Sequence, residues 1–289
     1  MNYNSERKNV LITGSKSQLA QCLFDIKDQY PDFDFDFTSS EELDISNTKE
    51  IEDYFDKVSY DIVINCAAYT NVELAEKESK KAFMVNAIGV KNIAEACKKN
   101  DATLIHISTD YVFDGKKETP YTEEDLPNPI NEYGKSKLEG EKEILKILDK
   151  YFIIRTSWLY SKYGHNFFKT ILRKSRTEKQ LTITASETGT PTNAHDLAKF
   201  ILEIVSSNSS DYGLYHYSNL GEATWHDFAE EILRASGKLS EIKLEKTDNY
   251  PTFAVRPKYG VLSKEKTIKV LKNTILHWKD SLRNLHSIN

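Results

Sequence analysis

The stretch VLITGSKSQLA, residues 10–20, decides the fold. Its first four residues are apolar or β-branched, as in a buried strand, and the residues from Gly14 onward suit a tight turn and the start of a helix. Short runs of the same apolar, β-branched kind alternate with longer helical patterns through the first half of the chain. This alternation is typical of βαβ units, so we expect an α/β fold with a doubly wound parallel sheet.

Apolar runs and helical periodicity place the other elements. In the first half, strands are predicted at residues 10–13, 33–37, 61–67, 103–109 and 152–157, and helices at residues 79–100 and 131–150. Beyond residue 157, helices are predicted at residues 167–176, 193–205 and 224–236, and strands at 181–184 and 213–218. Residues 114–131 contain three prolines and many acidic side chains, which predicts a long loop of a kind that is often functional.

Charge and composition exclude several classes of protein. The 289 residues include 39 Lys and Arg against 44 Asp and Glu, so no cationic excess is available to bind nucleic acid through its phosphates. No apolar run approaches the ~18 residues that cross a bilayer. The three cysteines, Cys22, Cys66 and Cys97, lack disulfide or metal-site spacing, and the scattered acidic residues indicate a solvated surface rather than metal ligands. We expect a cytoplasmic protein with no nucleic-acid or membrane partner and no metal site.

The loop after the first strand is the predicted dinucleotide site. In a doubly wound sheet, backbone N–H groups and the helix N-terminus there point at a pyrophosphate, and glycines let the backbone approach it. Only Gly14 remains of a G-x-x-G-x-x-G pattern, because Ser17 and Ala20 occupy the other two places. A purely structural turn is the alternative, but its place as the first βα turn favours NADPH or NADH. The choice between the two cofactors stays open, since Asp36 lies inside the second strand and no Arg follows it.

A second candidate site is the segment Tyr133-Gly134-Lys135-Ser136-Lys137 at the start of a predicted helix. Tyr133 and Lys137 lie on one helical face, where an ammonium lowers the pKa of a neighbouring phenol from its usual value of about 10. Chance spacing is the alternative interpretation, since the chain has 16 tyrosines. Ser108 and Thr109 end a buried strand, where parallel sheets bind ligands. A hydroxyl there either holds a substrate carbonyl near Tyr133 or simply caps the strand.

Together these segments resemble the extended short-chain dehydrogenase/reductases, and within them the dTDP-4-dehydrorhamnose reductase family. The resemblance covers nearly the whole chain in the family's order. It includes Asn65 to Thr70 with Ala75-Glu76, Val85-Asn86-Ala87, Ser108 to Gly115, Tyr133 to Lys137, Arg155 to Tyr160, Asn166-Phe167, Arg256-Pro257, Tyr259 to Leu262, Trp278 and Leu282. It implies a Rossmann sheet with a smaller C-terminal substrate-binding α/β region. We expect residues 1–157 plus about 180–219 to form the dinucleotide-binding domain, and about 158–179 plus 220–289 the substrate-binding domain.

The resemblance also implies roles for individual residues. Thr109, Tyr133 and Lys137 would form the catalytic triad, with Tyr133 as proton donor and Lys137 also holding the nicotinamide ribose. The cofactor would meet Gly14, Ser17, Gln18, Leu19, Asp44, Ile45, Cys66, Ala67 and Ala68 as well as Tyr133 and Lys137, and the substrate would meet Thr109, Asp110 and Trp158. Core packing is the alternative for Trp158, and Asn86 is expected to support the triad.

The implied reaction is reduction of the 4-keto group of dTDP-4-dehydro-L-rhamnose to dTDP-L-rhamnose by hydride from NADPH or NADH. Related dehydratases carry an Asp-Glu pair after the catalytic Thr, whereas Asp110 is followed here by Tyr111, which favours simple reduction. The lost loop glycines depart from the family pattern, and so does Glu73, where the family more often has Asp.

Two other functions stay open. One is a non-catalytic binding subunit that resembles the regulatory subunit of methionine adenosyltransferase. The other is a reductase or epimerase of another nucleotide sugar, because substrate identity lies in loop details. No sequence pattern decides the oligomeric state, and a homodimer is one candidate.

Overall fold

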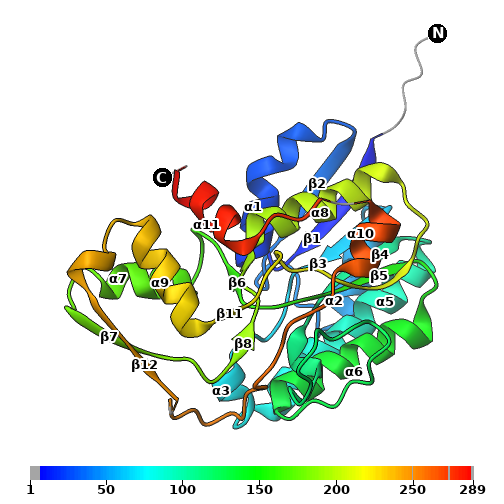
Figure 1. The fold of residues 1–289 in the computed structure, drawn as a ribbon. Coiled ribbons are helices and arrows are strands. Elements are labelled where there is room, and N and C mark those ends of the chain that lie inside the picture. Colours follow the sequence, from blue (N-terminus) through cyan, green and yellow to red (C-terminus); the bar gives the residue numbers. More distant parts are fainter. Residues whose placement is uncertain (1–6, 249, 273, 288–289) are drawn as a thin grey trace.

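The computed structural model describes residues 7–248, 250–272 and 274–287. At the centre of this part of the chain lies a six-stranded sheet in the order β2-β1-β3-β4-β5-β10, in which every neighbouring pair is parallel (Figure 1). Its strands are β1 (Lys8–Thr13), β2 (Phe33–Thr38), β3 (Ile62–Asn65), β4 (Thr103–Thr109), β5 (Tyr151–Thr156) and β10 (Gly213–His216). The predicted doubly wound parallel sheet is confirmed.

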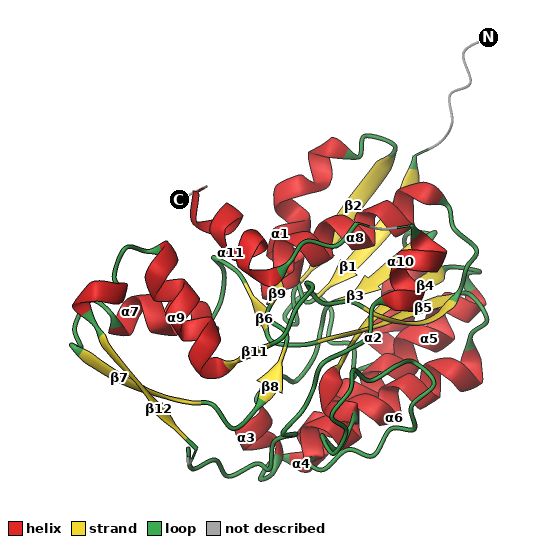
Figure 2. Cartoon of the chain, viewed as in Figure 1, coloured by secondary structure: helices red, strands yellow, loops and turns green. Residues whose placement is uncertain are grey.

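Helices cover both faces of the sheet (Figure 2). On the face that carries Val10 and Ile12 of β1 lie α1 (Gln18–Ile26) and α8 (Ala194–Ser207). On the face that carries Leu11 lie α2 (Thr48–Phe55), α5 (Val90–Lys99) and α6 (Glu132–Ile147). Successive strand residues point to opposite faces, so a strand that is buried on both sides requires an uninterrupted apolar run such as residues 10–12.

Several elements differ from their predicted bounds by one to three residues, and two of the differences have a clear physical reason. The third strand ends at Asn65 instead of residue 67, because Asn65 Oδ1 accepts the N–H of Ala67 (3.1 Å) as the chain leaves the sheet. The helix predicted over residues 79–100 consists of α4 (Ser79–Phe83), a π-helical turn over Met84–Gly89, and α5. At this turn the Asn86 carbonyl lies so close to Gly140 of α6 that a Cβ on Gly140 would be 2.1 Å from it. The turn therefore depends on helix-helix packing, which local periodicity does not encode.

A smaller region lies beside the carboxyl edge of the sheet (Figure 1). Its helices α7 (Phe167–Lys174), α9 (Trp225–Ala235) and α11 (Trp278–Ser287) share one apolar cluster. Its strands pair in parallel as β7 (Gln180–Thr184) with β12 (Lys243–Thr247), and antiparallel as β8 (Thr188–Gly189) with β11 (Ala223–Thr224). The division into two domains stays a prediction. These pairings favour placing residues 180–189 in the smaller region, although the predicted boundary put them in the dinucleotide-binding domain.

Shorter elements complete the described chain. They are β6 (Leu159–Tyr160), β9 (Thr192–Asn193), α3 (Val72–Ala75), α10 (Glu265–Leu271), and 3-10 turns at Lys27–Gln29, Asp110–Val112 and Leu239–Glu241. Residues 114–131 form the predicted long loop, which a single bridge joins to Leu262 through Tyr121. Within the described ranges, no helix combines the length and apolar character needed to cross a membrane.

Candidate active site

A cleft of about 550 Å³ opens at the carboxyl ends of β1, β3, β4 and β5. In an open parallel sheet this edge binds ligands, above all where the strand order reverses, which here is between β1 and β3. The cleft is lined by Lys16 to Leu19, Asn65 to Ala68, Thr70, Val72, Ile107 to Tyr111, Tyr133, Lys137, Thr156 to Leu159, Gly164, His165 and Trp225. Both the sheet and the smaller region therefore contribute to one site.

Most of the predicted site residues share this cleft. Those that line it are Ser17, Gln18, Leu19, Cys66, Ala67, Ala68, Thr109, Asp110, Tyr133, Lys137 and Trp158. Gly14 lies behind the lining, since a Cβ on it would meet the Ala67 backbone at 2.7 Å. Asp44 and Ile45 lie outside the lining: Asp44 accepts hydrogen bonds from Ser46, and Ile45 is buried against Gly89. Their predicted contact with adenine stays a prediction.

Thr109, at the end of β4, lies beside Tyr133 of α6 in the cleft. The Thr109 hydroxyl donates to Asp110 Oδ1 (3.1 Å), and its oxygen accepts the N–H of Tyr111 (3.2 Å). Thr109 and Tyr133 both line the cleft, so the two residues are placed to meet the same ligand.

The pKa of Tyr133 differs from the expectation. Burial raises it to about 12, while the hydrogen bond to Thr109 lowers it and the charge of Asp110 raises it further. The direction is opposite to the one that the Tyr–Lys spacing predicts, because the buried site disfavours the phenolate. A phenol of this kind keeps its proton at neutral pH and is suited to donating it.

Asp110 is buried, and its contacts are with neighbouring residues. Burial raises the pKa of Asp110 to about 7, and hydrogen bonds from Thr109 and from backbone amides offset only part of that rise. Its other oxygen faces Gly260, where a Cβ would lie 2.7 Å from Oδ2. The carboxyl group thus orients the Thr109 hydroxyl, and its predicted contact with substrate stays a prediction.

Lys137 lies one helical turn after Tyr133 and is only 2% exposed. Its Nζ donates to the carbonyl oxygen of Ile107 (2.6 Å) and lies 3.2 Å from His106 Nε2. Burial lowers the pKa of Lys137 to about 8, and the charge of Glu141 offsets part of that effect. Lys137 therefore changes its protonation state close to neutral pH.

The loop after β1 fits a dinucleotide despite its missing glycines. Gly14 has φ +68°, a left-handed conformation that favours glycine. Ser17 caps α1 by accepting the N–H of Ala20 (3.2 Å), so serine replaces the second glycine as an N-cap. Across the cleft from the first turn of α1 lie the small side chains of Ala67 and Ala68. A pyrophosphate has room there, next to a helix N-terminus whose first amides lack intrahelical partners.

Trp158 and Trp225 form an aromatic wall of the cleft. Their rings stack at 3.6 Å with 7° between the planes. Trp158 has φ +44°, which is rare for a bulky side chain, and Gly189 leaves room for its ring, since a Cβ there would lie 2.6 Å away. Strained backbone beside a cleft is typical of functional sites, which favours ligand contact over core packing for Trp158. Sequence reasoning missed Trp225, because nothing local marks it as a partner of Trp158.

Comparison with known proteins decides the family. The family described as the RmlD substrate binding domain matches residues 8–288. The dTDP-4-dehydrorhamnose reductase of Aggregatibacter actinomycetemcomitans is 35% identical, over 96% of this chain and 98% of that protein. The chain belongs to the dTDP-4-dehydrorhamnose reductase family. The predicted family is thereby confirmed.

Other members of this reductase family extend the likeness. A solved structure of the dTDP-4-dehydrorhamnose reductase of Bacillus anthracis in complex with NADP has a TM-score of 0.93 and 34% identity, covering 98% of this chain and 100% of that one. The dTDP-4-keto-6-deoxy-D-glucose reductase of Streptomyces niveus is 33% identical over 83% of this chain and 84% of that protein. Relatives named for two different dTDP-sugar reductions thus resemble this chain.

Glu73, the residue that departs from the family pattern, joins two segments that are far apart in the sequence. Its carboxylate accepts the N–H groups of Phe253 (2.7 Å) and Ala254 (3.2 Å) and pairs with Arg256 at 2.9 Å. Burial alone would raise the pKa of Glu73, but Arg256 and the two amides lower it overall. The side chain of Glu73 thus holds α3 against residues 253–256.

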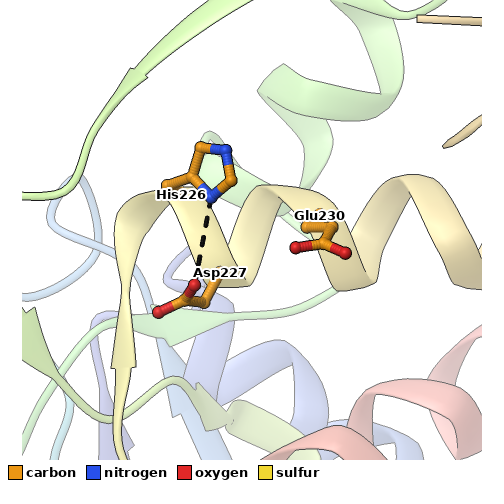
Figure 3. Close-up of side chains that lie close together, drawn as sticks. All are labelled: His226, Asp227 and Glu230. Carbon is orange, nitrogen blue, oxygen red and sulfur yellow. Dashed lines mark ion pairs between the residues drawn. The ribbon is translucent and has the colours of Figure 1, made fainter. Parts of the chain in front are cut away.

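Asn86 and the start of α9 show two further polar arrangements. Asn86 donates to the Tyr69 carbonyl oxygen (2.9 Å) and to Ser136 Oγ (3.0 Å), so it joins the loop after β3 to α6, and its expected support of the triad stays a prediction. His226, Asp227 and Glu230 gather on α9 with possible metal-ligand atoms within 4.8 Å of one another (Figure 3).

Both carboxylates of this α9 cluster already have partners. Asp227 accepts from Thr224 in the capping box of the helix, and Glu230 pairs with Arg234 at 2.5 Å. The His226 ring lies 3.9 Å from Asp227. Helix capping and ion pairing thus explain why these side chains gather here.

Proposed function

We propose that the protein reduces the 4-keto group of dTDP-4-dehydro-L-rhamnose to dTDP-L-rhamnose, with NADPH or NADH as reductant, in dTDP-rhamnose biosynthesis. One observation carries the proposal: Thr109, Tyr133 and Lys137 line one cleft together with the dinucleotide loop. A proton donor beside a dinucleotide loop is what ketone reduction requires. The names of the relatives support this substrate, and the NADP complex of one relative supports the cofactor.

The chain's own residues supply acid catalysis and positioning. A bound reduced nicotinamide would supply the hydride, and the first turn of α1 and Lys137 would hold it. Tyr133 gives its proton to the substrate oxygen as negative charge develops there, because its raised pKa of about 12 keeps it protonated until then. Thr109, which lines the cleft with Tyr133, would hold the substrate oxygen next to the phenol. Lys137, whose pKa is lowered to about 8, returns a proton to Tyr133 for the next turnover.

The test is a cofactor-oxidation assay. Protein given NADPH or NADH and the 4-keto sugar nucleotide should lose nicotinamide absorbance, and titration of both cofactors measures the preference. Tyr133→Phe should lower kcat roughly 10²- to 10⁴-fold, the usual share of general acid catalysis. Tyr151→Phe, at the far end of β5, is the control and should keep wild-type kcat. A folded wild-type protein that oxidises neither cofactor would rule the proposal out.

The alternative functions make different predictions. A non-catalytic binding subunit would copurify with a partner enzyme and oxidise no cofactor, but it has no need for the buried Thr109 and Lys137. A reductase of another sugar is favoured by the likeness to the Streptomyces niveus enzyme. Comparing kcat/KM for dTDP-4-dehydro-L-rhamnose with that for other 4-keto sugar nucleotides separates the two substrates.

The expected cytoplasmic location and homodimer belong to this proposal. Cys22, Cys66 and Cys97 all carry free thiols, which supports a reducing compartment. Fractionation of the source cells checks the location, and light scattering of the purified chain checks the oligomeric state.

A further inference from the structure

A chain of four buried polar side chains runs beneath the cleft, from β1 through β3 and β4 to α6. The Thr13 hydroxyl donates to Asn65 Oδ1 (2.7 Å), and Asn65 Nδ2 lies 3.1 Å from His106 Nδ1. His106 Nε2 in turn lies 3.2 Å from Lys137 Nζ. All four side chains are almost fully buried, so each hydrogen-bonding group must find its partner within the protein.

The backbone decides which way Asn65 points. Its Oδ1 accepts the N–H of Ala67 (3.1 Å), and a backbone N–H can only donate. The Asn65 oxygen therefore faces Ala67, and its NH₂ group faces His106 Nδ1. An NH₂ group is also only a donor, so His106 Nδ1 must accept.

The orientation of the Asn65 amide group then decides the tautomer of His106. Burial, followed by the charge of Lys137, holds the pKa of His106 well below its ordinary value of 6.5, so the ring is neutral. A neutral imidazole whose Nδ1 accepts carries its proton on Nε2. That N–H points at Lys137 Nζ, which is itself a donor when it is charged.

We propose that His106 is a positioning residue. It holds its proton on Nε2 and donates a hydrogen bond through this N–H to Lys137 Nζ, and so favours the neutral amine over the ammonium. A neutral amine accepts from His106, donates to the Ile107 carbonyl oxygen and keeps one N–H for the cleft. An ammonium would place a third N–H against the N–H of His106. By disfavouring the ammonium, the hydrogen-bond chain makes the Lys137 ammonium a stronger acid, which gives its proton to the Tyr133 phenolate and becomes the neutral amine that His106 stabilises. This role in turnover rests on the proposed function.

The other groups around Lys137 leave this arrangement in place. Glu141, one turn further along α6, favours the ammonium, but its carboxylate is bound by Arg155 at 2.6 Å and by Ser108. Cys66 lines the cleft as a thiol whose pKa burial raises to about 12. From the 3-10 turn after β4, Asp110 accepts from Thr109, and its charge acts on Tyr133. His106 is thus the group in direct contact with Lys137 Nζ whose proton position Asn65 controls.

The first test is read on the wild-type protein and needs no cofactor. Nitrogen NMR of the protein labelled with ¹⁵N-histidine reports which ring nitrogen carries the proton, and the His106 signal is assigned by its loss in His106→Gln. The proposal expects Nε2 to be protonated and Nδ1 bare from pH 6 to 9, within about the range where a buried neutral imidazole is stable. A proton on Nδ1, or an imidazolium signal, overturns it. Because no activity is measured, this outcome is separate from that of the proposed function.

The second test reverses the direction of the hydrogen bonds between residue 65 and Lys137. In Asn65→Asp the carboxylate accepts from Nδ1, so the imidazole moves its proton there and Nε2 becomes an acceptor for the Lys137 ammonium. The pH at which kcat falls should then rise by about one unit or more, because a nearby opposite charge and the reversed hydrogen bond both raise the pKa of Lys137. In a His106→Gln background, Asn65→Asp should shift the pH profile of kcat by less than half as much, because no imidazole is present to pass the reversed hydrogen bond on to Lys137.

Thr13→Val is the matched control. It removes the Thr13 hydroxyl from Asn65 but keeps the Ala67 N–H that orients the amide, so the tautomer should not change. Equal shifts of the pH profile with and without His106 would show a simple charge effect and overturn the proposal. If the substituted chains do not fold, the tautomer of the wild-type protein still decides it.

Discussion

The floor of the cleft and its aromatic wall are built on different principles. The floor comprises Thr109, Tyr133, Lys137 and the side chains bonded to them, which hang from adjacent parallel strands and one helix and are almost all joined by hydrogen bonds. The wall comprises Trp158 and Trp225, which come from distant segments and meet through ring stacking. A hydrogen-bonded floor holds protons in defined places, whereas a stacked wall provides shape. We therefore expect the chemistry at the floor and contact with the sugar nucleotide at the wall.

The largest effect is expected on the floor. Lys137→Met keeps the length of the side chain but removes the proton that is returned to Tyr133, and kcat should fall roughly 10²- to 10⁴-fold. The remaining activity should lose its dependence on pH near 8, because the titrating amine is gone. Lys135→Met is the control: this lysine is exposed on the same helix and pairs with Glu132, so its loss should leave kcat unchanged. A Lys137→Met variant with wild-type kcat and pH profile would break the comparison.

A smaller effect with another signature is expected on the wall. Trp225→Ala removes the ring that holds Trp158, and ring stacking contributes about 0.5–1.5 kcal/mol. The KM for the sugar nucleotide should therefore rise up to about tenfold, since 1.4 kcal/mol is a factor of ten. The KM for the nicotinamide cofactor should stay constant, and Trp225→Phe should restore most of the affinity. If Trp225→Ala lowers only kcat and leaves the KM for the sugar nucleotide unchanged, Trp225 acts in the chemical step, like the residues of the floor.

The smallest effect is expected at the dinucleotide loop. Ser17→Gly restores the glycine of the family pattern, and replacing a serine N-cap by glycine costs only a few tenths of a kcal/mol. Cofactor affinity measured by titration should therefore change by less than about twofold. Ser17→Ala, which loses the cap to Ala20, should destabilise the protein by about 1 kcal/mol in denaturant unfolding. A tenfold gain of affinity in Ser17→Gly would show that serine weakens the loop.

Sequence reasoning succeeded where a local pattern carries the physics. Strand β4 was predicted with its observed bounds, because its run of apolar and β-branched residues is typical of a strand that is buried on both faces. Tyr133 and Lys137 were placed on one face, because helical geometry alone does that. The π-helical turn at Met84–Gly89 was missed, since it depends on the close approach of Gly140 in another helix.

The sequence by itself determined the parallel sheet, the family and the residues that meet at the carboxyl edge of the sheet. These follow from apolar periodicity and from motifs that lie within a few residues of one another. Only the tertiary structure decided the pairing of Trp158 with Trp225, the raised pKa of Tyr133 and the direction of the hydrogen bonds from Asn65 to Lys137. The physical reason is that burial and hydrogen-bond direction depend on partners from other elements, which no local stretch of sequence contains.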